Sequence, residues 1–209
     1  MQPPFSREEF LGVFVAYHNA FAFMPVVLAA VGVIGAATLG KRPKLSLVIC
    51  AALWLWMALA YFAVLFSSLT PAGYLFAGLF AAQGFLLLHA AKQRTSPPVS
   101  ESNRSAALVA IVLVGYALVA YPAVGFLAGQ RYPAMPTFGL PCPTTIFTLG
   151  VLAWWGTSLP SRLLVIPTLW AVVGTSAALN FGIVEDLALL PAAVAVVVLR
   201  ARSWRTAAL

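Results

Sequence analysis

Long runs of apolar residues, separated by short charged stretches, dominate the hydropathy pattern of the chain. Residues 10–40, 105–130 and 163–184 carry no charged side chain. Residues 45–91 are also uncharged and form a run that is longer still. A helix that crosses the hydrocarbon core of a bilayer needs about 20 mostly apolar residues. The first three runs therefore predict one crossing each, and the fourth predicts two crossings joined by a turn near Pro71.

Together with two shorter apolar segments, these runs predict an all-α integral membrane bundle of seven transmembrane helices in a single domain over residues 1–209. A proline-rich, re-entrant or capping segment separates the fourth and fifth helices. The predicted spans are residues 10–38, 45–66, 71–91, 105–129, 144–159, 163–181 and 185–200, with a polar linker at 92–104 and an outer cap at 130–143.

The distribution of basic residues supports all seven crossings, because lysine and arginine near span ends favour the cytoplasmic side. With the N-terminus outside and the C-terminus in the cytoplasm, ten of the twelve basic residues fall inside, and only Arg7 and Arg131 fall outside. Without the last crossing the split becomes 7 to 5, and without the fifth it becomes 6 to 6. The net charge of +7 is therefore a signal of topology.

The composition agrees with this class and excludes others. The chain of 209 residues is 62% hydrophobic and 8% charged, with a mean hydropathy of +0.97. These values exclude a soluble globular domain and a disordered chain. The basic residues are too dispersed for a nucleic-acid surface, so we expect the lipid bilayer as partner, together with a second copy or another membrane protein.

Polar residues inside the predicted spans are few, and most of them fall near the outer leaflet. Such groups are costly in hydrocarbon, so they are the first candidates for a ligand site or pathway. For His18 and Asn19 the alternative is an interhelical hydrogen bond. We interpret Glu185 and Asp186 as markers of the outer end of the last span, with at most one facing inward, and proton or cation binding is the alternative. The candidates are His18, Asn19, Tyr121, Tyr132, Thr137, Thr144, Thr145, Asn180, Glu185 and Asp186.

Prolines predict kinks in this outer region. Pro25 and Pro122 each remove a backbone hydrogen bond from a predicted span. The segment from Tyr121 to Gly150 is so rich in proline and glycine that its outer loop cannot be a regular helix. It either lines a cavity as a structured cap, with Thr144 and Thr145 capping the helix behind it, or closes the bundle as a tight loop. The predicted structural prolines are Pro25, Pro122, Pro133, Pro136, Pro141 and Pro143.

Cys142 suggests a further chemistry, because thiolate and thioether ligands suit soft metals such as copper. Met135 is the nearest second sulfur, but no spacing typical of metal ligands is present, and a small buried thiol is the alternative. No disulfide with Cys50 is expected, since the two cysteines belong to opposite ends of their spans. The tryptophans, Trp170 among them, are interpreted as packing or interface residues rather than as a ligand cage.

The motif YPxxGxxxGxxYPxxPTFGxPCPTTIFTxG, which begins at Tyr121, resembles the signature of a bacterial family of multispanning membrane proteins of unknown function. The leader FSREEFLGVFVAYHNA, the LWLWM run and the Glu185-Asp186 pair extend the resemblance over nearly the whole chain. Gln130 stands where many relatives are expected to have histidine. The resemblance implies a multi-pass protein of the bacterial inner membrane with no established activity, so it supplies no catalytic residues.

The outer polar residues, the kinks and the cap together favour a permease-like or channel-like protein for a small solute or ion, with a site near the outer face. A non-transporting assembly partner is the main alternative, and metal handling through Cys142 is a weaker one. No catalytic motif is present, so we expect no enzyme and no cofactor.

Overall fold

The computed structural model describes residues 5–93 and 103–207, and the regular secondary structure in these ranges is helical apart from one isolated bridge between Phe138 and Leu140. Most of the predicted linker at 92–104 lies outside the described residues. The all-α prediction is confirmed for this part of the chain.

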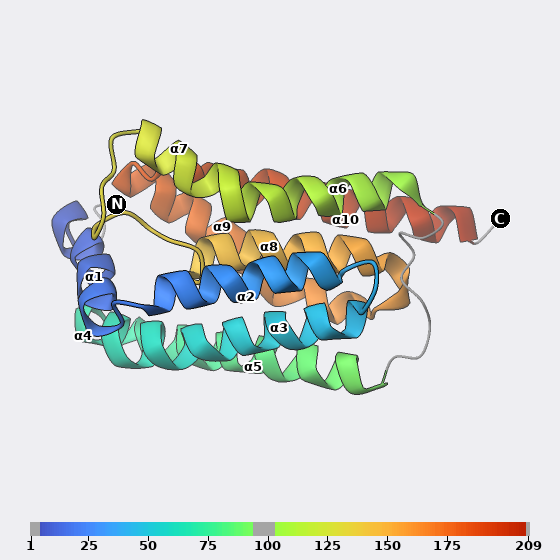
Figure 1. Cartoon of the computed structure of the whole chain (residues 1–209), viewed down its shortest axis with the longest axis horizontal. Helices are drawn as coiled ribbons and strands as arrows, with labels where there is room; N and C mark the ends of the chain where they lie inside the picture. The colour runs from blue at the N-terminus through green and yellow to red at the C-terminus, as the bar shows by residue number, and fades with distance from the viewer. Residues whose placement is uncertain (1–4, 94–102, 208–209) are drawn as a thin grey trace.

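The helices form a bundle of rods that lie side by side (Figure 1). α3 continues through a π-helical segment, η1, into the short α4, and α6 continues through a second π-helical segment, η3, into α7. The rods are α2 (Met24–Thr38), α3 (Pro43–Trp56) with η1 (Met57–Phe66) and α4 (Ser67–Leu69), α5 (Ala72–Gln93), α6 (Arg104–Gly115) with η3 (Tyr116–Ala120) and α7 (Tyr121–Leu127), α8 (Pro141–Trp155), α9 (Val165–Phe181) and α10 (Leu189–Ala207).

Within the described residues, four helices are long and apolar enough to cross a membrane: Pro43–Leu69, Ala72–Gln93, Arg104–Leu127 and Ser161–Phe181. The pair formed by α1 (Arg7–Ala20) and α2 meets the same test if counted as one span. The two segments predicted from shorter runs do not meet it. α8 has only 15 residues, and α10 carries Arg200, Arg202 and Arg205.

The run predicted as one span over 10–38 is broken into two helices. α1 starts at a capping box in which Ser6 and Glu9 bond each other's backbone, and it lies across one end of the bundle, bent by 88° from α2. Pro25 occupies the first turn of α2, where its missing N–H removes no helical hydrogen bond. Pro25 therefore begins a new helix instead of kinking a continuous one.

Pro122 also acts differently from a simple kink. The helix runs through it as one rod, Arg104–Leu127, and the chain widens into the π-helical turns of η3 just before it. The wider turns accommodate the proline ring and the missing N–H without breaking the rod. Pro141 and Pro143 lie in the first turn of α8, so that only Pro133 and Pro136 remain in the loop between α7 and α8.

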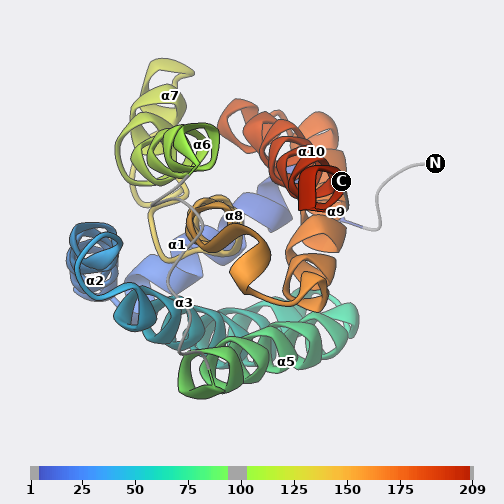
Figure 2. The same ribbon diagram turned by 90° about the vertical axis from the view of Figure 1, so that its right-hand side faces the viewer.

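α8 is the central helix of the molecule. Viewed along the bundle, it is surrounded by the other rods (Figure 2), and 13 of its 15 residues are buried, on all sides of the helix. Its Thr148 hydroxyl accepts a hydrogen bond of 2.9 Å from the indole N–H of Trp54 in α3. Short 3-10 turns, η4 (Gly156–Ser158) and η5 (Ser161–Leu164), then reverse the chain into α9.

Two glycines of α5 offer a matched test of how closely the chain packs at the turn between α4 and α5. A Cβ atom at Gly73 would lie 2.6 Å from the backbone nitrogen of Ser67, whereas one at Gly78 would have no atom within 4 Å. We expect Gly73→Ala to destabilise the protein by about 1–3 kcal/mol, because the backbone of Ser67 can move away from the added Cβ atom only at a cost in free energy. Gly78→Ala should leave stability unchanged or raise it by up to about 1 kcal/mol. Thermal unfolding in detergent micelles compares the two, and equal effects would contradict the packing at the α4–α5 turn.

Candidate functional site

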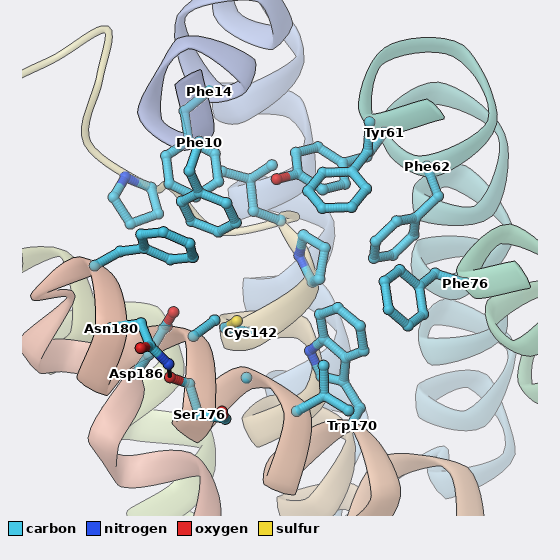
Figure 3. Close-up of a pocket in the computed structure, with 18 of the residues that line it drawn as sticks. Phe10, Phe14, Tyr61, Phe62, Phe76, Cys142, Trp170, Ser176, Asn180 and Asp186 are labelled. Atoms are coloured by element: carbon cyan, nitrogen blue, oxygen red, sulfur yellow. Dashed lines mark hydrogen bonds between the residues drawn. The ribbon is translucent and has the colours of Figure 1, made fainter. Parts of the chain in front are cut away.

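A cavity of about 470 Å³ lies at the end of the bundle crossed by α1 (Figure 3). We call it the aromatic chamber, because aromatic residues are the largest group among those that line it. α1, η1, α5, α9 and the first turn of α8 all contribute lining residues. The aromatic lining residues are Phe5, Phe10, Phe14, Tyr61, Phe62, Phe66, Phe76, Tyr121, Trp170 and Phe181.

The rings of the aromatic chamber hold one another in place. Phe10 of α1 stacks on Phe181 at the end of α9, with ring centroids 4.5 Å apart. Arg7 fixes the same junction by donating a 2.7 Å hydrogen bond to the Phe181 carbonyl. On the opposite side, Trp170 meets Phe62 and Phe76 edge to face, at 5.3 Å and 5.4 Å. The wall therefore presents both ring faces and ring edges to the interior.

Asp186 is the charged residue of this lining, and it is only 3% exposed. It lies in the 3-10 turn η6 (Val184–Ala188) between α9 and α10. The Tyr121 hydroxyl donates a short hydrogen bond to its Oδ1 atom. Figure 3 shows the Cys142 thiol beside it, on the side toward Trp170. Asp186, Tyr121 and Cys142 thus form a small polar floor in a mostly apolar chamber, whose other polar lining residues include Thr70, Ser176 and Asn180.

Glu185, the neighbour of Asp186, is buried on a different side of the turn. Gln130 donates a 3.1 Å hydrogen bond to its Oε2 atom, while Oε1 is buried and has no hydrogen-bond partner. A Cβ atom at Gly125 of α7 would lie 2.7 Å from Oε1, so that a larger residue there would require the Glu185 carboxyl group to shift. Tyr116 donates a 2.8 Å hydrogen bond to the Glu185 carbonyl.

The burial of both acids corrects the interpretation of the pair as interface markers with at most one facing inward. Glu185 is 0% exposed, because α7 and the loop after it cover the turn. The arginines nearest to this region are engaged elsewhere: Arg7 with the Phe181 carbonyl, and Arg131 with the carbonyls of Phe126 and Gln130. Within the described residues, neither acid has a recorded lysine or arginine partner.

The predicted cap is a folded segment that packs on the bundle. His18 of α1 holds it with both ring nitrogens: Nδ1 lies 2.6 Å from the Pro133 carbonyl and Nε2 lies 2.9 Å from the Thr137 hydroxyl. Since a carbonyl can only accept, Nδ1–H is the donor, and Nε2 then accepts from Thr137. The ring of Tyr132 packs against His18 at 4.9 Å. His18 is therefore a tether for the cap and lies outside the chamber lining.

Of the other candidate ligand residues, Asn180 shares the chamber lining with Asp186 and Tyr121, whereas Asn19, Thr144 and Thr145 do not line it. Asn19 is exposed on α1, and Met135 lies in the cap away from the chamber lining. Asn180 is exposed at the edge of the chamber and bonds the Ser176 carbonyl. The prediction that Thr144 and Thr145 cap α8 is wrong, because Leu140 occupies the N-cap position without a side-chain bond. Thr145 instead donates to the Pro141 carbonyl one turn earlier, and the Thr144 hydroxyl has no partner.

A metal site receives no support from this geometry. In the part of the chain that the structure describes, no group of three or more histidine, cysteine, aspartate or glutamate side chains could hold an ion. Cys142 has Asp186 as its neighbour, and Met135 does not join them in the lining.

Sequence reasoning missed the aromatic lining. Phe10, Phe62 and Trp170 are ordinary packing residues by type, and rings within spans are common. A signal was present in the phenylalanine spacing, since Phe10 and Phe14, like Phe62 and Phe66, are separated by four residues and so share a helix face.

The comparisons with known proteins give a family without an activity. Residues 7–209 match the model of a family of unknown function, DUF6064. The chain belongs to this family. No curated protein matches the chain, and no solved structure matches it either. The aromatic chamber, with its polar floor, is therefore the main guide to function.

The cap tether can be tested with neighbouring residues. We expect His18→Ala to accelerate amide hydrogen exchange in the segment 130–140 by about tenfold or more, because two buried hydrogen bonds are lost at about 1–3 kcal/mol for each unsatisfied group. Asn19→Ala, which alters an exposed side chain, should leave exchange unchanged. The exchange rates are measured by mass spectrometry. If both variants exchanged at the rate of the unmodified chain, the proposed tether would be contradicted.

Proposed function

We propose that the chain is a bacterial inner-membrane protein of seven spans that binds a small, largely apolar molecule in the aromatic chamber at its outer face, in a permease-like role. The single observation that carries the proposal is the chamber itself. Binding sites for small molecules are concave, mostly apolar, and about 300–1,000 Å³ in volume, with a few polar groups that fix orientation. A cavity of about 470 Å³ with a floor of Asp186, Tyr121 and Cys142 has these properties.

The exposed residues of the chamber lining support entry of a ligand from the side of the bundle. Four lining residues are exposed: Ala72 at the start of α5, and Val173, Ser176 and Asn180 on α9. The chamber therefore opens between the adjacent ends of α5 and α9. A molecule that dissolves in the outer leaflet or at its surface could enter there without crossing the charged headgroups of the inner side.

The chamber favours a permease-like role over an open channel. Its floor rests on the first turn of α8, and the rest of α8 is enclosed by packed side chains. Passage to the other side would need a rearrangement of helices, as in proteins that expose a site alternately to each face. The break between α1 and α2 and the two π-helical segments beside the chamber provide places where such movement could occur.

The proposed orientation has support from the positions of the basic residues. Arg7 and Arg131 lie at the end of the bundle that carries α1 and the cap. Lys92, Arg104 and Arg162 lie where α5 ends and where α6 and η5 begin, at the opposite end. Arg200 bonds the turn between α8 and η5 at that same end. The positive-inside rule then places the chamber outside.

Topology can be tested by single cysteines in a chain from which Cys50 and Cys142 have been removed by substitution with alanine. Arg131→Cys should react with a membrane-impermeant maleimide in intact cells, because the cap faces outward. Lys92→Cys should react only after the membrane is permeabilised. Both side chains are exposed, so the pair is matched for access. The opposite labelling pattern would reverse the proposed orientation.

The chamber can be tested by filling it. Ala177 lines the chamber, whereas Ala37 is exposed on α2. We expect the neutral probe neopentylbenzene to bind the unmodified chain in lipid nanodiscs. Ala177→Phe should weaken its binding by about tenfold or more, because the added ring occupies the same space. Ala37→Phe should not change binding. Equal affinity of all three chains, measured by equilibrium titration, would exclude the chamber as the binding site.

A further inference from the structure

We propose that the molecule held in the aromatic chamber is an organic cation: a small apolar amine or quaternary ammonium compound whose positive charge is balanced by Asp186. This inference rests on the proposed function, because it names the chemical class of the ligand for the same chamber. Three observations carry it: a buried acid without a cationic partner, the aromatic rings that line the same chamber, and the absence of basic residues from the lining.

The first observation is the unbalanced acid. A carboxyl group taken out of water is costly in its charged form unless a cation pairs with it, and otherwise it holds a proton. Asp186 is 3% exposed and has the Tyr121 hydroxyl as its recorded hydrogen-bond donor. Its other neighbours are Cys142 and the second buried acid, Glu185, neither of which supplies positive charge. A cationic ligand would supply it.

The second observation is the arrangement of the rings. Cations bind favourably over the faces of aromatic side chains, within about 6 Å of the ring centroid, and quaternary ammonium groups are commonly held in aromatic cages. Phe62 and Phe76 stand nearly perpendicular to Trp170, at interplanar angles of 77° and 81°. The rings that line the chamber therefore stand at different angles to one another, and an ammonium group inside it could lie over a ring face.

The third observation concerns what the lining lacks. Within the described residues, no lysine or arginine lines the chamber, which disfavours an anionic ligand. The nearby Arg7 is turned to the Phe181 carbonyl. Inorganic cations such as Na⁺ or Ca²⁺ are also poor candidates, because they need several converging oxygen ligands, whereas aromatic residues are the largest group in this lining. An ammonium group that carries its own apolar surface satisfies both the acid and the rings.

The test compares two probes of the same shape that differ in charge. Benzyltrimethylammonium and neopentylbenzene are isosteric, because the nitrogen of the first is replaced by carbon in the second. The full chain in lipid nanodiscs should bind the cation about tenfold or more tightly than the neutral isostere. Asp186→Asn should remove this preference, because it should weaken binding of the cation and leave the affinity for the neutral isostere unchanged. Glu8→Gln, which neutralises an exposed acid on α1, serves as the matched control and should keep the preference.

Each outcome decides between the two proposals. Equal binding of both probes by the unmodified chain would overturn the cationic ligand and leave the chamber as a site for apolar molecules. Binding of neither probe would overturn the proposed function itself. A preference that survives Asp186→Asn, with the variant's thermal unfolding intact, would show that Asp186 is not the counter-ion. The comparison of probes on the unmodified chain needs no variant and holds even if Asp186→Asn does not fold.

Discussion

The length of α8 is the constraint on which the end of the molecule that carries α1 and the cap depends. Its 15 residues extend about 22 Å, while the hydrocarbon core of a bilayer is about 30 Å thick. α8 is enclosed on all sides by other rods and does not face lipid. The difference between its length and the thickness of the hydrocarbon core therefore cannot be relieved by placing α8 at the lipid surface. The space beyond its first turn must be filled by something else. α1, which lies across the bundle, and the cap tethered by His18 fill part of it, and the aromatic chamber is what remains.

This arrangement also explains why the polar groups gather there. A buried rod such as α8 leaves no room for ionisable groups along most of its length, and the residues around it are apolar. Asp186, Tyr121 and Cys142 meet only at its first turn, to which Cys142 belongs. The backbone adapts in the same place: the chain breaks before Pro25, widens at η1 and η3, and uses a 3-10 turn to bury Glu185 and Asp186. Irregular backbone at this depth is tolerated where it is buried in protein or lines a cavity.

Much of the fold could be predicted from apolar runs, because their length relative to the bilayer is a simple physical requirement. The helices over Pro43–Leu69, Ala72–Gln93, Arg104–Leu127 and Ser161–Phe181 follow from it directly. The break of the first apolar run into α1 and α2 could not be predicted in this way. Hydropathy does not depend on the direction in which a helix runs, and Pro25 is compatible with either a kink or the start of a helix. The burial of Glu185 and Asp186 together depends on α7 and Gln130, which are distant in sequence. The chamber could not be predicted because Phe10, Phe62 and Trp170 are of the same types as ordinary packing residues. They differ from such residues only in that they leave a cavity between them.

A crystal of the protein soaked with 4-bromobenzyltrimethylammonium would show whether the aromatic chamber is a ligand site. Bromine scatters anomalously, so its position can be located independently of the rest of the electron density. We expect a bromine peak inside the chamber between α5 and α9, with the ammonium group beside Asp186 and within about 6 Å of the ring of Phe62 or Trp170. A well-occupied peak elsewhere on the molecule, with none in the chamber, would rule out the chamber as the ligand site.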